Sequence, residues 1–181
     1  MTPIEIFLAL LGIIIFVIFA TAALAGLKAA PYVPTYQRDV RRMLKLADVR
    51  PDELVVDLGA GDGRFLLTAA AEFKARGLGF EFSFLPFVVA RLRIIARQLQ
   101  SRVRIMPKDF FSQDLAAADV VTCFLTPAAM KKLEPKFQQE LRPGARIVSY
   151  AFKLPTWVPS KIDKPTPTST PVFLYRVAGQ D

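Results

Sequence analysis

Histidine is absent from the 181-residue sequence, and cysteine occurs once, as Cys123. Without histidine, no imidazole base can activate a serine or cysteine nucleophile, and a zinc site built from cysteine and histidine is excluded. We therefore expect no metal site. A single cysteine cannot form a disulfide within the chain, which agrees with a reducing compartment. Since Cys123 lies in an apolar run, we expect it to be a buried packing residue.

Charge is absent from a long segment between Glu5 and Lys28. The 22 residues of Ile6–Leu27 are apolar or small, and as an α-helix they would extend about 33 Å, enough to cross a hydrocarbon core of roughly 30 Å. A core helix of this length would normally carry a polar face, which this segment lacks. A signal peptide would begin with basic residues, which are missing, although the small residues of Ala20–Ala25 resemble a cleavage site. The segment predicts a transmembrane helix, with a signal peptide as the alternative.

Basic residues follow this segment and do not precede it. By the positive-inside rule, the rest of the chain is expected in the cytoplasm, or on the equivalent matrix side of an organelle. The net charge is +8, and since Glu5 is the only charge before Lys28, the part from Lys28 onward carries +9. Such a charge suits nucleic acid, an anionic membrane or an acidic partner. Beside a membrane span we expect anionic lipid headgroups as partners, and without an RNA-binding motif we expect no specific nucleic acid.

The sequence pattern divides the chain into three parts. Residues 1–28 are the predicted anchor, and residues 29–50 are a proline-containing linker with an amphipathic helix at 36–47. In residues 51–181, short apolar runs alternate with helical patterns, which is typical of an α/β fold with a parallel sheet covered on both faces. The predicted strands are 54–58, 78–82, 103–106, 119–124, 145–151, 161–164 and 171–177, and the predicted helices are 63–73, 86–100 and 128–140.

A glycine-rich turn follows the first predicted strand and opens a helix. Its glycines, Gly59, Gly61 and Gly63, allow a tight turn and close approach to a ligand, and the helix start offers free N–H groups. A dinucleotide-binding turn, G-x-G-x-x-G, would need its third glycine at position 64, where this chain has Arg64. With Asp57 two residues before the first glycine, the pattern resembles motif I of class I methyltransferases, which use S-adenosyl-L-methionine. A tight turn without a ligand is the alternative.

Two further acids follow the next predicted strands. Glu81 lies 24 residues after Asp57, where a carboxylate can accept hydrogen bonds from both ribose hydroxyls of a nucleoside. Asp109 lies beyond the third strand, where its carboxylate can accept from an adenine amino group while Phe110 packs on the ring. Each acid has an ordinary solvated role as its alternative. Since the C-terminal ends of parallel strands share one edge of the sheet, we expect the three acids at one ligand site.

A series of segments carries a more specific resemblance. The sequence resembles the small protein-lysine methyltransferases that act on the mitochondrial ATP synthase c subunit and the adenine nucleotide translocase, together with archaeal relatives of broad lysine specificity. The resemblance covers nearly all of residues 31–159. The matching segments are Pro31–Thr35, Asp57–Arg64, Gly79–Glu81, Asp109–Phe111, Ala118–Pro127, Leu141–Ser149 and Phe152–Pro159.

This resemblance implies a Rossmann-like class I methyltransferase sheet, S-adenosyl-L-methionine as cofactor, and methylation of lysine on a membrane-associated protein. It also implies Thr35 as a cofactor-binding residue. This fold places substrate-side groups at the end of the fourth strand, which makes Phe124 and Thr126 candidate catalytic residues. Trp157 is the third candidate catalytic residue. Trp157 and Tyr32 are candidates to line the lysine slot, with core packing as the alternative for each. A methyltransferase of lipid or quinone, and a membrane-tethered cofactor-binding protein without turnover, remain alternatives.

The sequence departs from the family pattern at two places. Ala60 stands where we expect serine, a mild change. The stretch Phe82–Phe87 is unusually aromatic and contains Pro86, where we expect a more polar helix start. An aromatic stretch at this place favours contact with a partner or a membrane surface.

Overall fold

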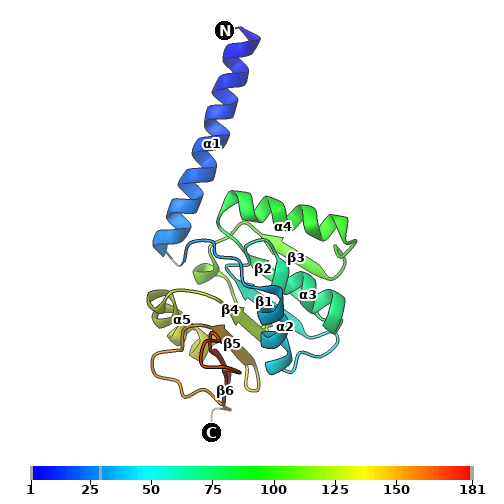
Figure 1. Cartoon of the computed structure of the whole chain (residues 1–181), viewed down its shortest axis with the longest axis vertical. Coiled ribbons are helices and arrows are strands. Elements are labelled where there is room, and N and C mark those ends of the chain that lie inside the picture. The colour runs from blue at the N-terminus through cyan, green and yellow to red at the C-terminus, as the bar shows by residue number, and fades with distance from the viewer. Residues whose placement is uncertain (1, 29, 180–181) are drawn as a thin grey trace.

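A seven-stranded sheet forms the centre of the molecule, and one long helix projects from it (Figure 1). The computed structural model describes residues 2–28 and 30–179. Residues 1, 29 and 181, at which three of the predicted boundaries between the parts of the chain fall, lie outside the described residues. The strands are β1 (Leu54–Leu58), β2 (Arg76–Phe80), β3 (Val103–Met106), β4 (Val120–Cys123), β5 (Arg146–Tyr150), β6 (Lys161–Asp163) and β7 (Val172–Arg176). The helices are α1 (Pro3–Lys28), α2 (Gln37–Leu46), α3 (Arg64–Phe73), α4 (Phe84–Ala96) and α5 (Pro127–Glu140), with a 3-10 turn, η1, at Phe110–Ser112.

The strand order in the sheet is β3-β2-β1-β4-β5-β7-β6. Strands β1 to β5 are parallel, and β7 runs antiparallel to both β5 and β6. The chain moves outward from β1 to β3 and then returns to β4, beside β1. An open α/β sheet binds ligands at such a reversal of strand order, outside the C-terminal ends of its strands. The α/β Rossmann-like prediction is therefore confirmed, and the reversal lies between β1 and β4.

The two faces of the sheet have separate apolar layers. On one face, α2 packs near β5 through Val40 and Met43, and α3 and α4 pack over β2 and β3. On the other face, α5 buries Met130, Leu133 and Phe137 against β1, β4 and β5. Both faces of the parallel strands are thus covered, which agrees with the mostly apolar sequences of β1 and β4 at the centre of the sheet.

Most elements lie within two residues of their predicted positions, and the differences have local causes. Strand β2 begins at Arg76 because its backbone pairs with Leu54 of β1 there, although Arg76 and Gly77 are not apolar. Helix α4 begins at Phe84, before Pro86, since the N–H groups of a first helical turn have no partner within the helix and proline is tolerated there. It ends at Ala96 rather than near residue 100, and Gln98 has a positive φ of 54°.

Helix α1 stands apart from the sheet over most of its length (Figure 1). It is long and apolar enough to cross a membrane, and none of its most apolar window is buried. Only its last turns meet the domain, where the Phe84 N–H donates to Thr21 Oγ1 at 3.1 Å. The start of α4 is therefore hydrogen-bonded to α1 at Thr21, near the C-terminal end of α1.

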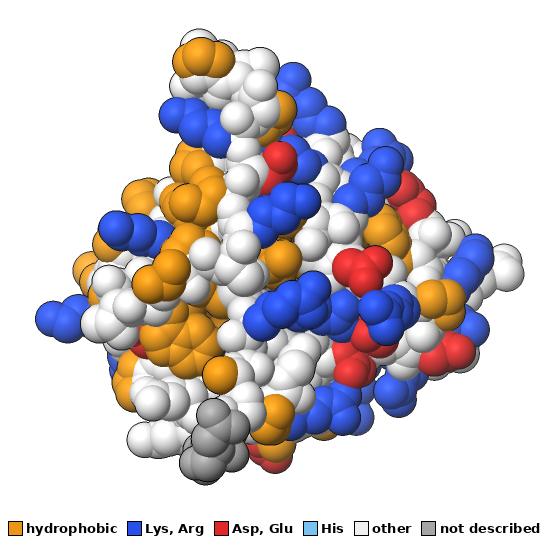
Figure 2. Space-filling view, turned by 90° about the horizontal axis from the view of Figure 1, so that it is seen from below, with side chains coloured by type: hydrophobic (Ala, Val, Ile, Leu, Met, Phe, Trp, Pro, Cys, Tyr) orange, Lys and Arg blue, Asp and Glu red, His pale blue; other side chains and the backbone are white. Residues whose placement is uncertain are grey.

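Basic side chains are not confined to the side from which α1 projects. Seen from the opposite side, Lys and Arg form a broad band beside an apolar area (Figure 2). The net charge alone therefore does not identify a membrane-facing surface.

Candidate functional site

A cavity lies at the C-terminal ends of β1, β2 and β4, beside the last turns of α1. Its empty space is about 830 Å³, a volume that includes space open to solvent. Segments that are separate in sequence line it: Ala25, Ala30–Thr35, Asp57, Gly59–Asp62, Arg64, Phe65, Glu81–Ser83, Asp109–Phe111, Phe124 and Leu125. The predicted Thr35, Asp57, Gly59, Gly61, Glu81, Asp109 and Phe110 are thus brought together, while Gly63 lies just outside, at the N-cap of α3.

The glycine-rich turn has a backbone conformation that other residues rarely adopt. Gly59, Gly61 and Gly63 have φ values of 78°, 54° and 78°. A Cβ at Gly61 would lie 2.7 Å from Cε2 of Tyr32. The Tyr32 ring therefore packs directly on the turn, and the segment 31–35 forms one wall of the cavity.

Glu81 follows β2 and is buried. Its Oε2 accepts from the Gly61 N–H at 2.8 Å, and its Oε1 accepts from the Ser83 N–H at 2.6 Å. These bonds fix the carboxylate against the glycine-rich turn. Since an ionised carboxylate has about four acceptor positions, Glu81 keeps capacity for two ribose hydroxyls.

Asp57, the last residue but one of β1, carries a buried carboxylate. Its Oδ1 accepts from Thr122 Oγ1 of β4 at 2.7 Å, whereas Oδ2 has no hydrogen-bond partner among the described residues. Burial raises the pKa of Asp57 to about 7, and the nearby charges of Glu81 and Asp62 act in the same direction. A buried acceptor without a partner needs a donor or a cation to offset its desolvation. Asp57 therefore presents an acceptor next to the cavity.

Asp62 organises the entrance of α3. It forms ion pairs with Arg64, 2.6 Å away, and with Arg93 of α4. Burial would raise the pKa of Asp62, but the two arginines outweigh it and lower the pKa. Arg64 also donates to the carbonyl oxygen of Thr35, which ties segment 31–35 to α3. Burial, and then the charge of Asp62, raise the pKa of Tyr32, so its hydroxyl stays neutral at physiological pH.

The sequence did not lead us to predict this ion-pair network, although Asp62 and Arg64 belong to the glycine-rich segment Asp57–Arg64. Their spacing was the available signal: an acid two residues before an arginine at a helix start. Nothing in the sequence pointed to the pairing with Arg93, 31 residues away.

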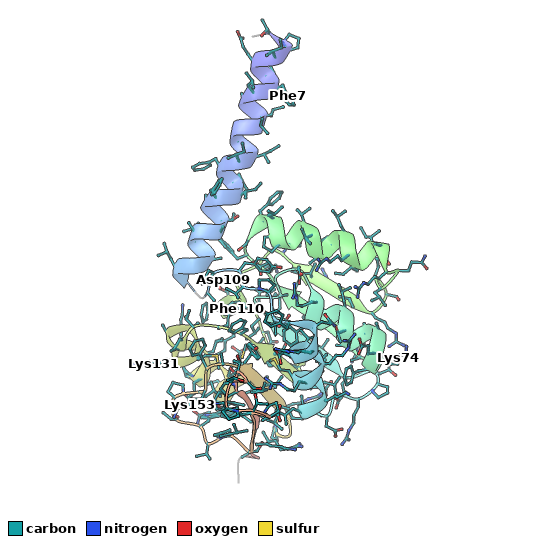
Figure 3. All side chains as sticks on the ribbon, viewed as in Figure 1. Phe7, Lys74, Asp109, Phe110, Lys131 and Lys153 are labelled. Carbon is teal, nitrogen blue, oxygen red and sulfur yellow. The ribbon has the colours of Figure 1, made fainter. Side chains whose placement is uncertain are left out.

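Asp109 and Phe110 lie where α1 meets the domain (Figure 3). Asp109 Oδ1 accepts from the Phe111 N–H at 3.0 Å and so caps the turn η1. The rings of Phe110 and Phe111 are 4.5 Å apart, and both residues line the cavity. An acid and an aromatic surface thus stand together, as binding of an adenine requires.

The predicted catalytic residues separate in space. Phe124 lines the cavity, and its ring meets the Tyr150 ring edge-on at 4.9 Å. Thr126 caps α5 by accepting from the Ala129 N–H at 3.3 Å. The Trp157 ring packs edge-on against Tyr175 at 6.5 Å, outside the set of cavity-lining residues. A direct role in chemistry therefore stays a prediction for all three.

Comparison with known proteins agrees with this arrangement. The family model described as the ANTKMT methyltransferase domain matches residues 57–161, more than half of the chain. The chain belongs to this methyltransferase family. A protein-lysine N-methyltransferase of Saccharolobus islandicus is 40% identical over 135 residues, covering 74% of this chain and 84% of that protein.

Two further relatives extend the comparison. The adenine nucleotide translocase lysine N-methyltransferase of Mus musculus is 35% identical over 82% of this chain and 67% of that protein. The crystal structure of an RNA methyltransferase from Salinibacter ruber, in complex with S-adenosyl-L-homocysteine, has a TM-score of 0.79 and 33% identity. It matches 82% of this methyltransferase and 96% of that chain.

The cofactor of this methyltransferase is S-adenosyl-L-methionine, and the cavity fits it in two respects. Glu81 and Asp109 stand at two strand ends, and Asp57 Oδ2, which has no hydrogen-bond partner among the described residues, suits a cationic group. Four acids line the cavity, Asp57, Asp62, Glu81 and Asp109, against one basic residue, Arg64, which pairs with Asp62. An acidic lining favours a cofactor that carries a sulfonium and an ammonium group.

Proposed function

We propose that this methyltransferase transfers a methyl group to lysine side chains of a membrane-associated protein. The relatives named above include protein-lysine methyltransferases, one of them named for the adenine nucleotide translocase. The observation that carries the proposal is that Ala25 of the apolar helix α1 lines the same cavity as Asp57 and Glu81. If α1 spans a membrane, the cavity lies within a few residues of the membrane surface.

The proposed location follows from α1 and its flanks. With α1 as the single span, the sheet domain is on the cytoplasmic or matrix side, because basic residues follow the span. Confinement to the membrane raises the effective concentration of a membrane substrate around the cavity. Anionic headgroups are the proposed lipid partners.

The chain supplies orientation and partial desolvation of the reacting amine rather than an acid or base. S-adenosyl-L-methionine, when bound, supplies an activated methyl group on sulfur. Asp57, Glu81 and Asp109 would hold the cofactor, and Tyr32 and Phe124 form an aromatic part of the wall. A lysine with an ordinary pKa of about 10.4 must lose its proton before it attacks the methyl carbon, and a partly desolvated aromatic slot favours the neutral amine. Since the sequence has no histidine, we assign proton acceptance to water.

The proposal is tested by incubating membranes that contain the full chain with S-adenosylmethionine labelled in the methyl group. We expect label in protein, recovered as methyl-lysine after hydrolysis, and no label above background with the Glu81→Ala variant. Label in extracted lipid or quinone would contradict the proposal in favour of a lipid substrate. Label in RNA would favour the activity for which the Salinibacter ruber relative is named.

A further inference from the structure

Helix α4 has an apolar face on the side away from the sheet. Its inner face packs on the sheet through Phe87, Ala90 and Ile94. On the outer face, Leu85, Val89, Leu92 and Ala96 recur at spacings of four, three and four, which aligns them in one stripe. Leu85 is 51% exposed and Leu92 is 61% exposed. A helix that covers a sheet in water normally presents polar residues on this side, so the stripe lacks a partner in the described chain.

The stripe lies on the side from which α1 projects. Figure 1 shows α4 along the top of the domain, running across the direction of α1. The hydrogen bond from the Phe84 N–H to Thr21 places the start of α4 level with Thr21 along the axis of α1. From Pro3 to Ala20, the 18 residues of α1 above this height would extend about 27 Å. That length matches a hydrocarbon core of roughly 30 Å, so a bilayer crossed by α1 would have its surface at α4.

Arginines flank the stripe. Arg91 and Arg93 belong to α4 and Arg97 is its C-cap residue. All three are exposed, and Arg93 also pairs with Asp62. Long basic side chains beside an apolar stripe are typical of helices that lie in the membrane interface, where the charged ends reach the headgroups and the apolar residues enter the acyl boundary. The charge and the apolar stripe therefore suit the same occupant, an anionic bilayer.

We propose that α4 is a second membrane contact, lying flat in the bilayer surface with Leu85, Val89 and Leu92 among the lipids and its arginines at the headgroups. This inference rests on the proposed function, since it takes α1 to span the membrane. Two contacts, one across the bilayer and one along it, fix the orientation of the sheet. Ala25, which lines the cavity, is four residues beyond Thr21, or about 6 Å along α1. The substrate lysine thus lies in the headgroup region of a membrane protein.

The test measures the depth of a thiol-attached fluorophore in the full chain, reconstituted in vesicles of phosphatidylcholine and phosphatidylserine. Cys123 is buried, so labelling reports introduced cysteines. Three variants are compared: Leu92→Cys on α4, Ile13→Cys in α1, and Lys153→Cys on the far part of the domain (Figure 3). With brominated lipids, we expect at least twofold quenching at Leu92→Cys and Ile13→Cys and none at Lys153→Cys.

The outcomes separate this inference from the membrane span. Quenching at Ile13→Cys but not at Leu92→Cys would overturn the α4 contact and leave the span intact. No quenching at either position would overturn both. Shielding of Leu92→Cys from an aqueous quencher, without quenching by lipid, would mean that a second protein chain covers the stripe, and it would also overturn the proposal.

A functional variant adds a matched control. Leu92→Glu places a negative charge in the stripe, and Gln139→Glu places the same charge on an exposed part of α5. We expect Leu92→Glu to reduce methylation in intact membranes at least fivefold and to leave cofactor affinity within twofold of the parent. Gln139→Glu should change neither quantity. Equal membrane activity of Leu92→Glu and Gln139→Glu would contradict the proposal.

Discussion

The two sides of the cavity are built in different ways. On the cofactor side, Glu81 and Asp109 are each fixed by backbone N–H groups, at 2.6–3.0 Å. On the side of β4, Phe124 and Leu125 contribute apolar surface, and Thr126 serves the start of α5. Hydrogen-bonded carboxylates define the cofactor side of the cavity, and the packing of apolar side chains defines the side of β4. Substitutions on the cofactor side should therefore have large, specific effects, whereas those on the other side should have graded effects.

The largest effect is expected for Glu81→Ala. It removes an acceptor from the Gly61 and Ser83 N–H groups as well as from the cofactor, and charge-assisted hydrogen bonds contribute about 1.5–3 kcal/mol each. We expect the Kd for S-adenosylhomocysteine to rise about 100-fold or more, measured by calorimetry. Asp109→Ala is the comparison and should cost about tenfold, since one contact is lost. Parent-like binding by both variants would contradict the assigned strand-end roles.

Gly61→Ala should have the next largest effect. The new Cβ would meet the Tyr32 ring at 2.7 Å, and φ at this position is 54°. Left-handed backbone costs an L-residue about 1–2 kcal/mol, so together with displacement of the ring we expect cofactor affinity to fall roughly 10- to 30-fold. Adding Tyr32→Ala should recover the loss of cofactor affinity that the clash with the ring causes, but not the loss that the strained backbone causes. No recovery in the double variant would mean that Tyr32 does not press on the turn.

A smaller effect concerns the pH dependence of stability without cofactor. The pKa of Asp57 is about 7 in the folded chain and about 3.9 in an unfolded one. Between these values the folded state binds more protons, so this residue makes the fold less stable as pH rises from about 4 to 7, with no further change above. We expect Tm to fall more between pH 5 and pH 7.5 in the parent than in Asp57→Asn. Equal slopes in both proteins would mean that Asp57 does not titrate in this range.

The smallest effect is expected on the other side of the cavity. Trp157 packs against Tyr175 away from the cavity, whereas Phe124 lines it. Trp157→Phe keeps an aromatic contact, so we expect kcat/KM for the protein substrate to stay within about threefold of the parent, and Phe124→Leu to lower it more. A tenfold or larger rise in KM for Trp157→Phe would instead support the role in the substrate slot that the sequence predicts.

The cofactor side was accessible from sequence because its signals are local. The spacing of Asp57 and Gly59 to Gly63, and the place of Glu81 after a strand, follow from how a chain turns at the end of a parallel strand. The contact of Tyr32 with Gly61 was not accessible, because it joins segments 29 residues apart through packing alone. The start of β2 at Arg76 was missed for a similar reason, since pairing with β1 overrides the apolar pattern.

The position of β7 has a consequence for the order of synthesis. This strand lies between β5 and β6, although it is the last strand of the described chain. After Tyr150, the last residue of β5, 26 more residues complete β7 at Arg176, which takes roughly one to five seconds at about 5–20 residues per second. During that interval the edge of β5 is unpaired, and an unpaired strand edge invites association with other chains. Completion of the sheet therefore depends on the last part of the described chain, and with the proposed membrane span this step takes place beside the membrane, where other nascent chains compete for the free edge.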